Sequence, residues 1–147
     1  MSFNLQTQQQ LVIDASVAVK WFLPEAHAET ALRIVNSDVS LMAPDLIWAE
    51  LGNVLWKKWR QGRLDVKEVQ ALLDDFARAP LEIHPSGTLN KDAWLVAHST
   101  GRGFYDSLYV ALAMRTSSVL ITADERLHNA LKGSGWARYC IWLGDVA

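Results

Sequence analysis

The sequence is poor in cysteine and contains no long hydrophobic run. Its single cysteine, Cys140, cannot form a disulfide within the chain, and its apolar neighbours predict a buried, unreactive thiol. A helix that spans a bilayer needs about 18 or more apolar residues, and no stretch approaches that length. The polar opening MSFNLQTQQQ lacks the basic start and apolar middle of a secretory signal. We therefore expect a cytoplasmic protein with no membrane segment.

An excess of positive charge is also missing. The 14 basic and 16 acidic residues give a formal net charge of −2, so any binding of nucleic acid must depend on a local basic patch. Half of the residues are hydrophobic and a fifth are charged, which is typical of a folded globular protein. The length predicts a single domain over residues 1–147, in which residues 1–10 are a polar N-terminal extension to which we assign no function.

Five short apolar runs bounded by turn residues predict strands, and longer helix-like segments lie between them. Alternation of strands and helices indicates an α/β fold. We predict a three-layer α/β/α sandwich with a mostly parallel central sheet and helices on both faces. The predicted strands are Leu11–Ile13, Val39–Met42, Leu81–Ile83, Val119–Ile121 and Tyr139–Leu143.

Capping and stop signals place the helices between these strands. Ser16 suits the N-cap of a short helix, Pro44 suits the first turn of a long helix, and Gly62 suits the end of that helix. Asp65 and Glu68 form an acidic version of the capping box at the start of the next helix. Three further helices are expected, over Asn90–Thr100, Asp106–Arg115 and Asp124–Leu131.

Four acidic residues stand out because of where the predicted elements place them. Asp14 directly follows the first strand, and Asp124 follows the fourth strand with only Ala123 between. Both therefore lie at the carboxyl ends of strands, the edge at which open parallel sheets bind ligands. Asp106 opens the helix DSLYVALAM at the same edge, and Glu50 projects from an apolar face of the helix PDLIWAELGNVLWKKW, which could cover that edge.

Each of these acids has a simpler interpretation when it is taken alone. An aspartate at a helix start can cap the helix or complement its dipole, and Glu50 can be a rim residue of a half-exposed helix. Four converging carboxylates, however, would repel one another unless cations lay between them. Mg²⁺ or Mn²⁺ suits such a site because hard divalent cations prefer oxygen ligands. Zinc does not, since the histidines show no metal-ligand spacing: His27, His84, His98 and His128.

A pair of divalent cations held by carboxylates is suited to the hydrolysis of a phosphodiester. One ion activates a water molecule and the other stabilises the leaving oxygen, so no covalent residue is needed. Ser16 and Thr122 lie beside Asp14 and Asp124. Their hydroxyls are placed either to support a ligand carboxylate or a metal-bound water, or to serve simply as a cap and a strand-end hydroxyl.

Two other functions are compatible with an aspartate at the end of a strand. A phosphoryl-transfer domain of the receiver or haloacid type also has one, but DAS is not its two-acid motif and LEIHPS supplies no acceptor aspartate. A non-catalytic binding module, in which the acids only cap helices and a tryptophan-rich helix holds a partner, predicts no affinity for metal. Titration with Mn²⁺ distinguishes that module from a nuclease.

The segments that carry the four acids resemble the motif blocks of PIN-domain ribonucleases, most closely the VapC-type toxins of bacterial toxin–antitoxin pairs. These segments are VIDASVAVKWFLPE, AELGNVL, YDSLYVALA and LITADERL, within a match from about Leu11 to Leu143. Some members have a further aspartate just after the last acid, where this chain has Glu125 and Arg126.

The resemblance implies an α/β sandwich with a parallel sheet, cleavage of RNA that depends on Mg²⁺ or Mn²⁺, and inhibition by a small cognate antitoxin. The catalytic, metal-binding acids that it implies are Asp14, Glu50, Asp106 and Asp124, and the supporting polar groups are Ser16 and Thr122.

Binding of RNA requires positive charge near the acids. Arg102, four residues before Asp106 in the sequence GRG, is our first candidate for a contact to a substrate phosphate, and the alternative is a flexible surface arginine. The whole set of candidate cations is Lys20, Lys57, Lys58, Arg60, Arg63, Arg102 and Arg126.

The long helix with Glu50 is apolar nearly all round. Trp48, Leu51, Leu55 and Trp59 form a stripe opposite the face of Glu50. We expect one stripe to meet the core and the other to bind a second chain, either an identical subunit in a homodimer or an antitoxin helix, unless both are buried within one domain.

Overall fold

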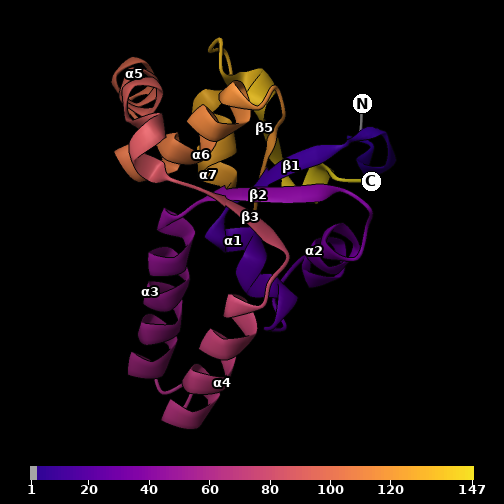
Figure 1. Cartoon of the computed structure of the whole chain (residues 1–147), viewed down its shortest axis with the longest axis vertical. Coiled ribbons are helices and arrows are strands. Elements are labelled where there is room, and N and C mark those ends of the chain that lie inside the picture. Colours follow the sequence, from indigo (N-terminus) through magenta and orange to yellow (C-terminus); the bar gives the residue numbers. More distant parts are fainter. Residues whose placement is uncertain (1–2) are drawn as a thin grey trace.

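A five-stranded parallel sheet forms the centre of the molecule in the computed structural model, which describes residues 3–147 (Figure 1). The strand order is β3-β2-β1-β4-β5, so β1 lies between β2 and β4. The strands are β1 (Gln10–Ile13), β2 (Ser40–Pro44), β3 (Leu81–His84), β4 (Leu120–Thr122) and β5 (Cys140–Trp142). All five predicted strands are thus confirmed, with ends that differ from the predicted ones by no more than two residues.

The helices cover both faces of this sheet, as the α/β/α prediction requires (Figure 1). From β1 to β3 the chain adds strands on one side of β1. It then crosses back and adds β4 and β5 on the other side of β1. Right-handed crossovers therefore place the two groups of helices on opposite faces. One face carries α1 (Ala15–Ala18), α2 (Ala28–Val35), α3 (Leu46–Arg60) and α4 (Val66–Ala77); the other carries α5 (Asn90–Thr100), α6 (Phe104–Arg115) and α7 (Glu125–Leu131).

Short 3₁₀ helices complete the chain. They are Leu5–Thr7, Val19–Trp21, Ser86–Leu89, Ala137–Tyr139 and Leu143–Asp145. The first of them lies in the N-terminal extension, where Leu5 is buried and Phe3 forms a parallel bridge with Val146. The part of the extension that the structure describes therefore packs on the domain beside the C-terminal end.

The predicted helix ends are partly confirmed. Helix α5 has the predicted bounds and ends at Gly101 with a left-handed backbone, and Asp65 and Glu68 form the predicted capping box of α4. Two predicted start signals are wrong. Asp14, not Ser16, is the N-cap of α1, because its backbone is extended and its side chain accepts the amide of Val17. Pro44 ends β2, so that α3 begins at Leu46.

Helix α6 is the centre of the core. Its residues 107–113 are all buried where the helix crosses β1, β2 and β4. Cys140 is also buried, as predicted, and burial raises the pKa of its thiol to about 12. Although the middle of α6 is apolar and buried, neither it nor any other helix within residues 3–147 is long and apolar enough to cross a bilayer.

Helix α3 packs differently from the prediction. Its buried residues are Ile47, Leu51 and Leu55, whereas Trp48 and Trp59 are 37% and 46% exposed. The predicted division into two faces is wrong because the buried residues form a single row spaced four apart. This row joins Leu51 and Leu55 of the predicted stripe to Ile47, which lies on the face of Glu50. Trp59 lines a hollow between α3 and α4, and Trp48 is exposed.

Candidate metal centre and active site

A hollow of about 260 Å³ lies at the carboxyl edge of the sheet and brings the four predicted acids together. Asp14 comes from the end of β1, Glu50 from α3, Asp106 from the first turn of α6, and Asp124 from the start of α7. The hollow is lined by Asp14, Ala15, Ser16, Glu50, Asn53, Val54, Lys57, Asp106, Tyr109 and Asp124. Side chains separated by up to 110 residues in sequence therefore share one site.

Asp14 is held by hydroxyl groups from two strand ends. The parallel register pairs Ile13 with Ile121, so the next residues, Asp14 and Thr122, lie opposite each other. Thr122 Oγ1 donates to Asp14 Oδ2 at 2.6 Å, and Ser16 Oγ donates to Asp14 Oδ1 at 2.5 Å. Asp14 Oδ1 also accepts the amide of Val17 at 3.2 Å as the cap of α1. The carboxylate is therefore both a helix cap and a member of the acid cluster.

Backbone amides fix the direction of these hydroxyl hydrogen bonds. The amide of Ala123 donates to Ser16 Oγ at 2.9 Å, and the amide of Asp124 donates to Thr122 Oγ1 at 3.1 Å. Because each hydroxyl oxygen already accepts a backbone hydrogen, its own proton is directed to Asp14. Ser16 and Thr122, which were predicted as supporting groups, thus orient Asp14 and join the ends of β1 and β4.

The charge on Asp14 is unfavourable in this environment. The side chain is only 8% exposed, and burial raises its pKa from 3.8 to about 6, against the effect of the hydrogen bonds from Ser16, Thr122 and Val17. The negative charge of Glu50 contributes to the rise. A buried carboxylate of raised pKa beside a second acid favours the binding of a cation.

Glu50 is compensated by a residue that was not predicted. The hydroxyl of Tyr109 donates to Glu50 Oε1 at 2.5 Å, from the second turn of α6. Burial raises the pKa of Glu50, this hydrogen bond opposes the rise, and the charge of Asp106 adds to it. Burial and the negative charges of the neighbouring acids, that of Glu50 first, raise the pKa of Tyr109, so that its hydroxyl remains a donor. The signal in the sequence was the polar tip of a tyrosine three residues after Asp106 in an otherwise apolar helix.

The other two acids lie at the outer side of the hollow, where both are half-buried. Asp106 Oδ2 accepts from Arg102 Nη2 at 3.2 Å, so the arginine predicted to bind a substrate phosphate contacts an acid of the site itself. Asp124 Oδ1 caps α7 by accepting the amides of Arg126 at 3.0 Å and Leu127 at 3.4 Å. Both the cap interpretation and the site interpretation of Asp124 therefore have a geometric basis.

The donor atoms of this hollow match a hard divalent cation in their chemistry, since four carboxylates supply only oxygen. Within residues 3–147, however, no three acidic, histidine or cysteine side chains are arranged so that they could hold an ion as they stand. Asp14, Glu50 and Asp106 instead each accept from a protein side chain: Ser16 and Thr122, Tyr109, and Arg102 respectively. A cation would thus have to compete with these donors and draw the carboxylates together.

Comparison with known proteins agrees with this arrangement. The PIN domain family model matches residues 11–132, a range that contains all four acids. Ribonuclease VapC3 of Pyrobaculum aerophilum is 36% identical over 121 residues, which cover 80% of this chain and 92% of that protein.

Two solved structures are similar in fold. The crystal structure of PAE2754 from Pyrobaculum aerophilum has a TM-score of 0.62 at 25% identity and covers 92% of this chain and 91% of that one. A toxin–antitoxin complex from Klebsiella pneumoniae has a TM-score of 0.59 at 13% identity, over 89% of this chain and 95% of that chain, which shows the fold alone. The motif blocks, the parallel sheet and the family match lead to one conclusion: the chain belongs to the PIN-domain family.

Proposed function

We propose that this chain is a metal-dependent endoribonuclease that hydrolyses RNA phosphodiesters and acts as the toxin of a toxin–antitoxin pair. The observation that carries the proposal is the hollow in which Asp14, Glu50, Asp106 and Asp124 converge from four elements. A relative that is 36% identical over most of its length is named a ribonuclease. The buried position of Asp14 adds support, because a carboxylate there costs stability that a purely structural role does not require.

Mg²⁺ or Mn²⁺ is the cation that we propose for the hollow, with Asp14, Glu50, Asp106 and Asp124 as the residues that would hold it. When bound, such cations supply positive charge that offsets the negative charge gained by a phosphodiester during hydrolysis. PIN-domain ribonucleases generally depend on divalent metal, and the all-oxygen donor set favours these two ions over zinc.

The residues around the acids have separate tasks in this proposal. Ser16 and Thr122 hold both oxygens of Asp14 in one orientation, so that the carboxylate is positioned before any ligand arrives. Tyr109 holds one oxygen of Glu50 and opposes the rise of its pKa, because a hydrogen bond to a carboxylate favours the charged form. No covalent intermediate with the protein is required.

Cleavage of RNA by the purified protein tests this function. We expect cleavage with Mg²⁺ or Mn²⁺, arrest by a chelator, and a loss of about 100-fold or more in Asp14→Asn and in Asp106→Asn. Asp74→Asn, an exposed aspartate on α4 far from the hollow, is the matched control and should cleave like the wild type. If both site variants cleaved RNA at the wild-type rate, the proposal would fail.

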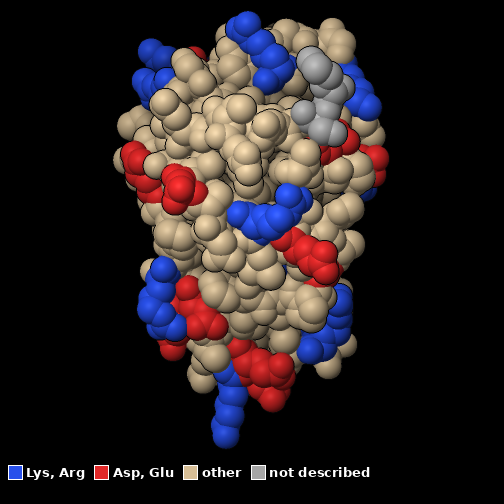
Figure 2. Space-filling model, turned by 90° about the vertical axis from the view of Figure 1, so that its right-hand side faces the viewer, with Lys and Arg blue, Asp and Glu red and all other residues tan. Residues whose placement is uncertain are grey.

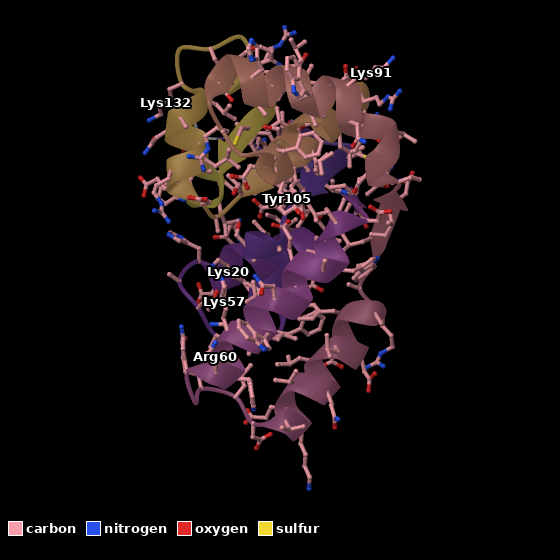
Figure 3. The ribbon with its side chains drawn as sticks, turned by 90° about the vertical axis from the view of Figure 1, so that its left-hand side faces the viewer. Lys20, Lys57, Arg60, Lys91, Tyr105 and Lys132 are labelled. Atoms are coloured by element: carbon pink, nitrogen blue, oxygen red, sulfur yellow. The ribbon has the colours of Figure 1, made fainter. Side chains whose placement is uncertain are left out.

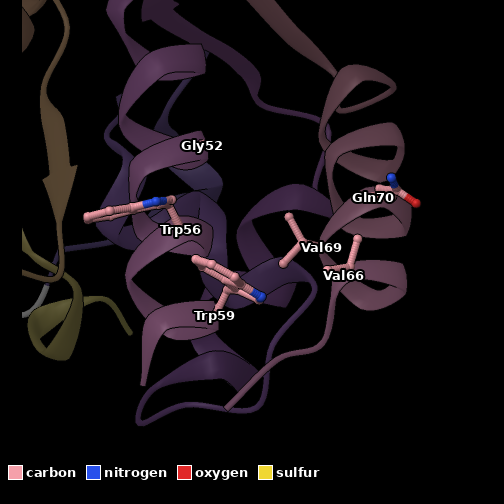
Figure 4. Close-up of a pocket in the computed structure, with 6 residues that line it drawn as sticks. All are labelled: Gly52, Trp56, Trp59, Val66, Val69 and Gln70. Carbon is pink, nitrogen blue, oxygen red and sulfur yellow. The ribbon is translucent and has the colours of Figure 1, made fainter. Parts of the chain in front are cut away.

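The proposed protein partner is a small antitoxin, and an identical subunit is the second partner that we expect. A hollow of about 280 Å³ between α3 and α4 offers a mainly apolar surface for such a chain (Figure 4). It is lined by Gly52, Trp56, Trp59, Val66, Val69 and Gln70, and is named here the tryptophan groove. A solved structure of the same fold is a toxin–antitoxin complex, which supports the antitoxin as the first of the two.

A further inference from the structure

The acidic hollow contains one basic side chain within the part of the chain that the structure describes. Four carboxylates and Lys57 line it, together with uncharged groups. An RNA strand that enters this hollow brings a negative phosphate at every nucleotide, and cations at the scissile phosphate do not neutralise its neighbours. A basic side chain of the protein is therefore needed beside the acids.

The other candidate cations are already engaged. Lys20 and Lys58 both contact Glu25, at 3.3 Å and 2.9 Å. Arg102 contacts Asp106 at 3.2 Å, and its Nε is buried without a hydrogen-bond partner among residues 3–147.

The remaining candidates lie outside the acidic hollow. The guanidinium of Arg60 lies over the ring of Trp56, 5.1 Å from its centroid, and Arg63 lines a separate hollow with Glu25 and Lys58. Arg126 is 92% exposed beside Asp124, at a distance of 4.0 Å. None of these three is among the residues that line the acids.

Lys57 differs from all of them. No side-chain hydrogen bond or ion pair engages it within residues 3–147, and it is exposed on the same side of the molecule as Lys20 and Tyr105 (Figure 3). The face on the opposite side carries basic and acidic side chains in small mixed groups, and its described part shows no continuous basic area (Figure 2). Among residues 3–147, Lys57 is thus the unpaired basic residue that lines the hollow with the acids.

Helix geometry fixes how Lys57 relates to the acids. Glu50, Asn53, Val54 and Lys57 follow one face of α3 at spacings of three and four residues, and all four line the hollow. Seven residues of helix separate Glu50 from Lys57 by about 10 Å along the axis. The backbone of Lys57 therefore lies about two turns from Glu50 along α3, while its side chain still lines the hollow.

We propose that Lys57 binds an RNA phosphate that neighbours the cleaved one, and so positions the strand over the four acids. This assignment rests on the proposed ribonuclease function. It makes Lys57 a substrate-binding residue in place of Arg102, whose charge is paired with Asp106. Asn53, one turn nearer to Glu50, lies between Lys57 and the acids on the same path.

Steady-state cleavage of a single-stranded RNA by Lys57→Gln tests the proposal. KM should rise about tenfold, the loss of one charge-assisted contact, while kcat changes much less. In the Asp14→Asn background, where RNA is bound without being cut, the slope of log affinity against log salt should fall by about 0.7, the value for one phosphate contact to a single strand. Lys57→Arg keeps the positive charge, so its KM and its salt slope should both lie close to the wild-type values.

Lys91→Gln on α5 is the matched control, because Lys91 is exposed and does not line the hollow. It should leave KM and the salt slope at wild-type values. Wild-type KM and slope in Lys57→Gln, or a loss confined to kcat, would overturn the role of Lys57 and leave the ribonuclease function in place. Absence of RNA cleavage by the wild type would instead overturn the proposed function and this assignment with it.

Discussion

Asp14 shows at the scale of one residue how structure and function share a side chain. It caps α1, accepts two hydroxyl hydrogen bonds and faces the hollow. The same environment raises its pKa to about 6, because burial outweighs the hydrogen bonds that favour its charge. A cap alone would be served as well by an exposed aspartate, and the cation that we propose for the hollow would offset the charge of this buried one.

The cost of this buried charge should appear in the pH dependence of stability. Below about pH 4 Asp14 is protonated in both the folded and unfolded protein, and it carries no penalty. Between about pH 4 and 6 the unfolded state releases the proton first, so the free energy of unfolding falls as pH rises. Above pH 6 the penalty approaches about 3 kcal/mol, the equivalent of roughly two pKa units.

Asp14→Asn has no such proton to lose. In the presence of a chelator, the free energy of unfolding of Asp14→Asn should therefore increase relative to that of the wild type as pH rises from 4 to 8. Denaturant unfolding at each pH measures this difference. Asp74→Asn should follow the wild-type curve throughout. A stability difference between Asp14→Asn and the wild type that does not vary with pH would contradict the raised pKa.

Tyr109→Phe tests the partner of Glu50. Loss of the hydroxyl removes the hydrogen bond that favours the charged form, so the pKa of Glu50 should rise. We expect a loss of about 1 kcal/mol in unfolding free energy and a shift of the acidic limb of the pH–rate profile for RNA cleavage to higher pH. Tyr105→Phe, an exposed tyrosine on the same helix, should change neither quantity. An unmoved acidic limb in Tyr109→Phe would exclude this role.

The meeting of the acids and the two hydroxyl donors of Asp14, Ser16 and Thr122, was predictable from the sequence, but the donors to Glu50 and Asp106 were not. Asp14 and Asp124 follow strands and so had to meet at one edge once the sheet is parallel. Tyr109 sits in the apolar run of α6, where a buried tyrosine is ordinarily core, and only the packing of α6 against α3 reveals its contact with Glu50. Arg102 was chosen for its closeness to Asp106, and the structure pairs it with that same residue.

Among the elements, the hairpin of α3 and α4 projects from the sheet and carries the tryptophan groove (Figure 1). Gly62 ends α3 with φ +72°, a left-handed conformation that an L side chain adopts only with strain. Gly52 lies inside α3, and a Cβ at either glycine would meet open space. The two positions therefore differ in backbone conformation and not in crowding.

Alanine at these two glycines should have opposite effects on stability. Gly62→Ala should lower the free energy of unfolding by about 1 kcal/mol, because it forces a Cβ into the left-handed region. Gly52→Ala should raise it by about 0.5–1 kcal/mol, because alanine loses less entropy in a helix. Thermal or denaturant unfolding of both variants measures this, and the same sign in both would contradict the assigned end of α3.

Element ends were predicted best where one residue type determines the backbone. Gly101 and the Asp65–Glu68 box mark their helix ends as expected, since few residues substitute for them there. The packing of α3 was predicted poorly because its apolar residues surround the helix, and periodicity alone cannot select which row is buried. The tertiary contacts of Ile47, Leu51 and Leu55 decide that choice.

Over the whole molecule, the order β3-β2-β1-β4-β5 joins segments that are remote in sequence. The order of the strands reverses at β1 and β4, which are parallel neighbours, so their carboxyl ends lie side by side. Helices α3 and α6 pack from opposite faces of the sheet (Figure 1). The site is therefore a product of the topology, and local sequence shows only its separate parts.

The tryptophan groove should be required for the partner and not for catalysis. Trp59→Glu places a charge in the groove, so binding of the cognate antitoxin should weaken about 100-fold or more while cleavage of RNA by the free protein is unchanged. Trp94→Glu alters another exposed tryptophan, on α5, and is the control. Equal antitoxin affinity in both variants, measured by calorimetry, would remove the groove from the proposal.

The central claim is that Asp14, Glu50, Asp106 and Asp124 together bind divalent cations. Anomalous diffraction from crystals grown with Mn²⁺ measures this directly, because it locates the ion without reference to activity. We expect manganese in the hollow, in contact with Asp14 and at least two of the other three carboxylates, and no manganese there in Asp14→Asn. A hollow without manganese in wild-type crystals, or manganese bound elsewhere with the four acids still engaged by their protein donors, would contradict the account.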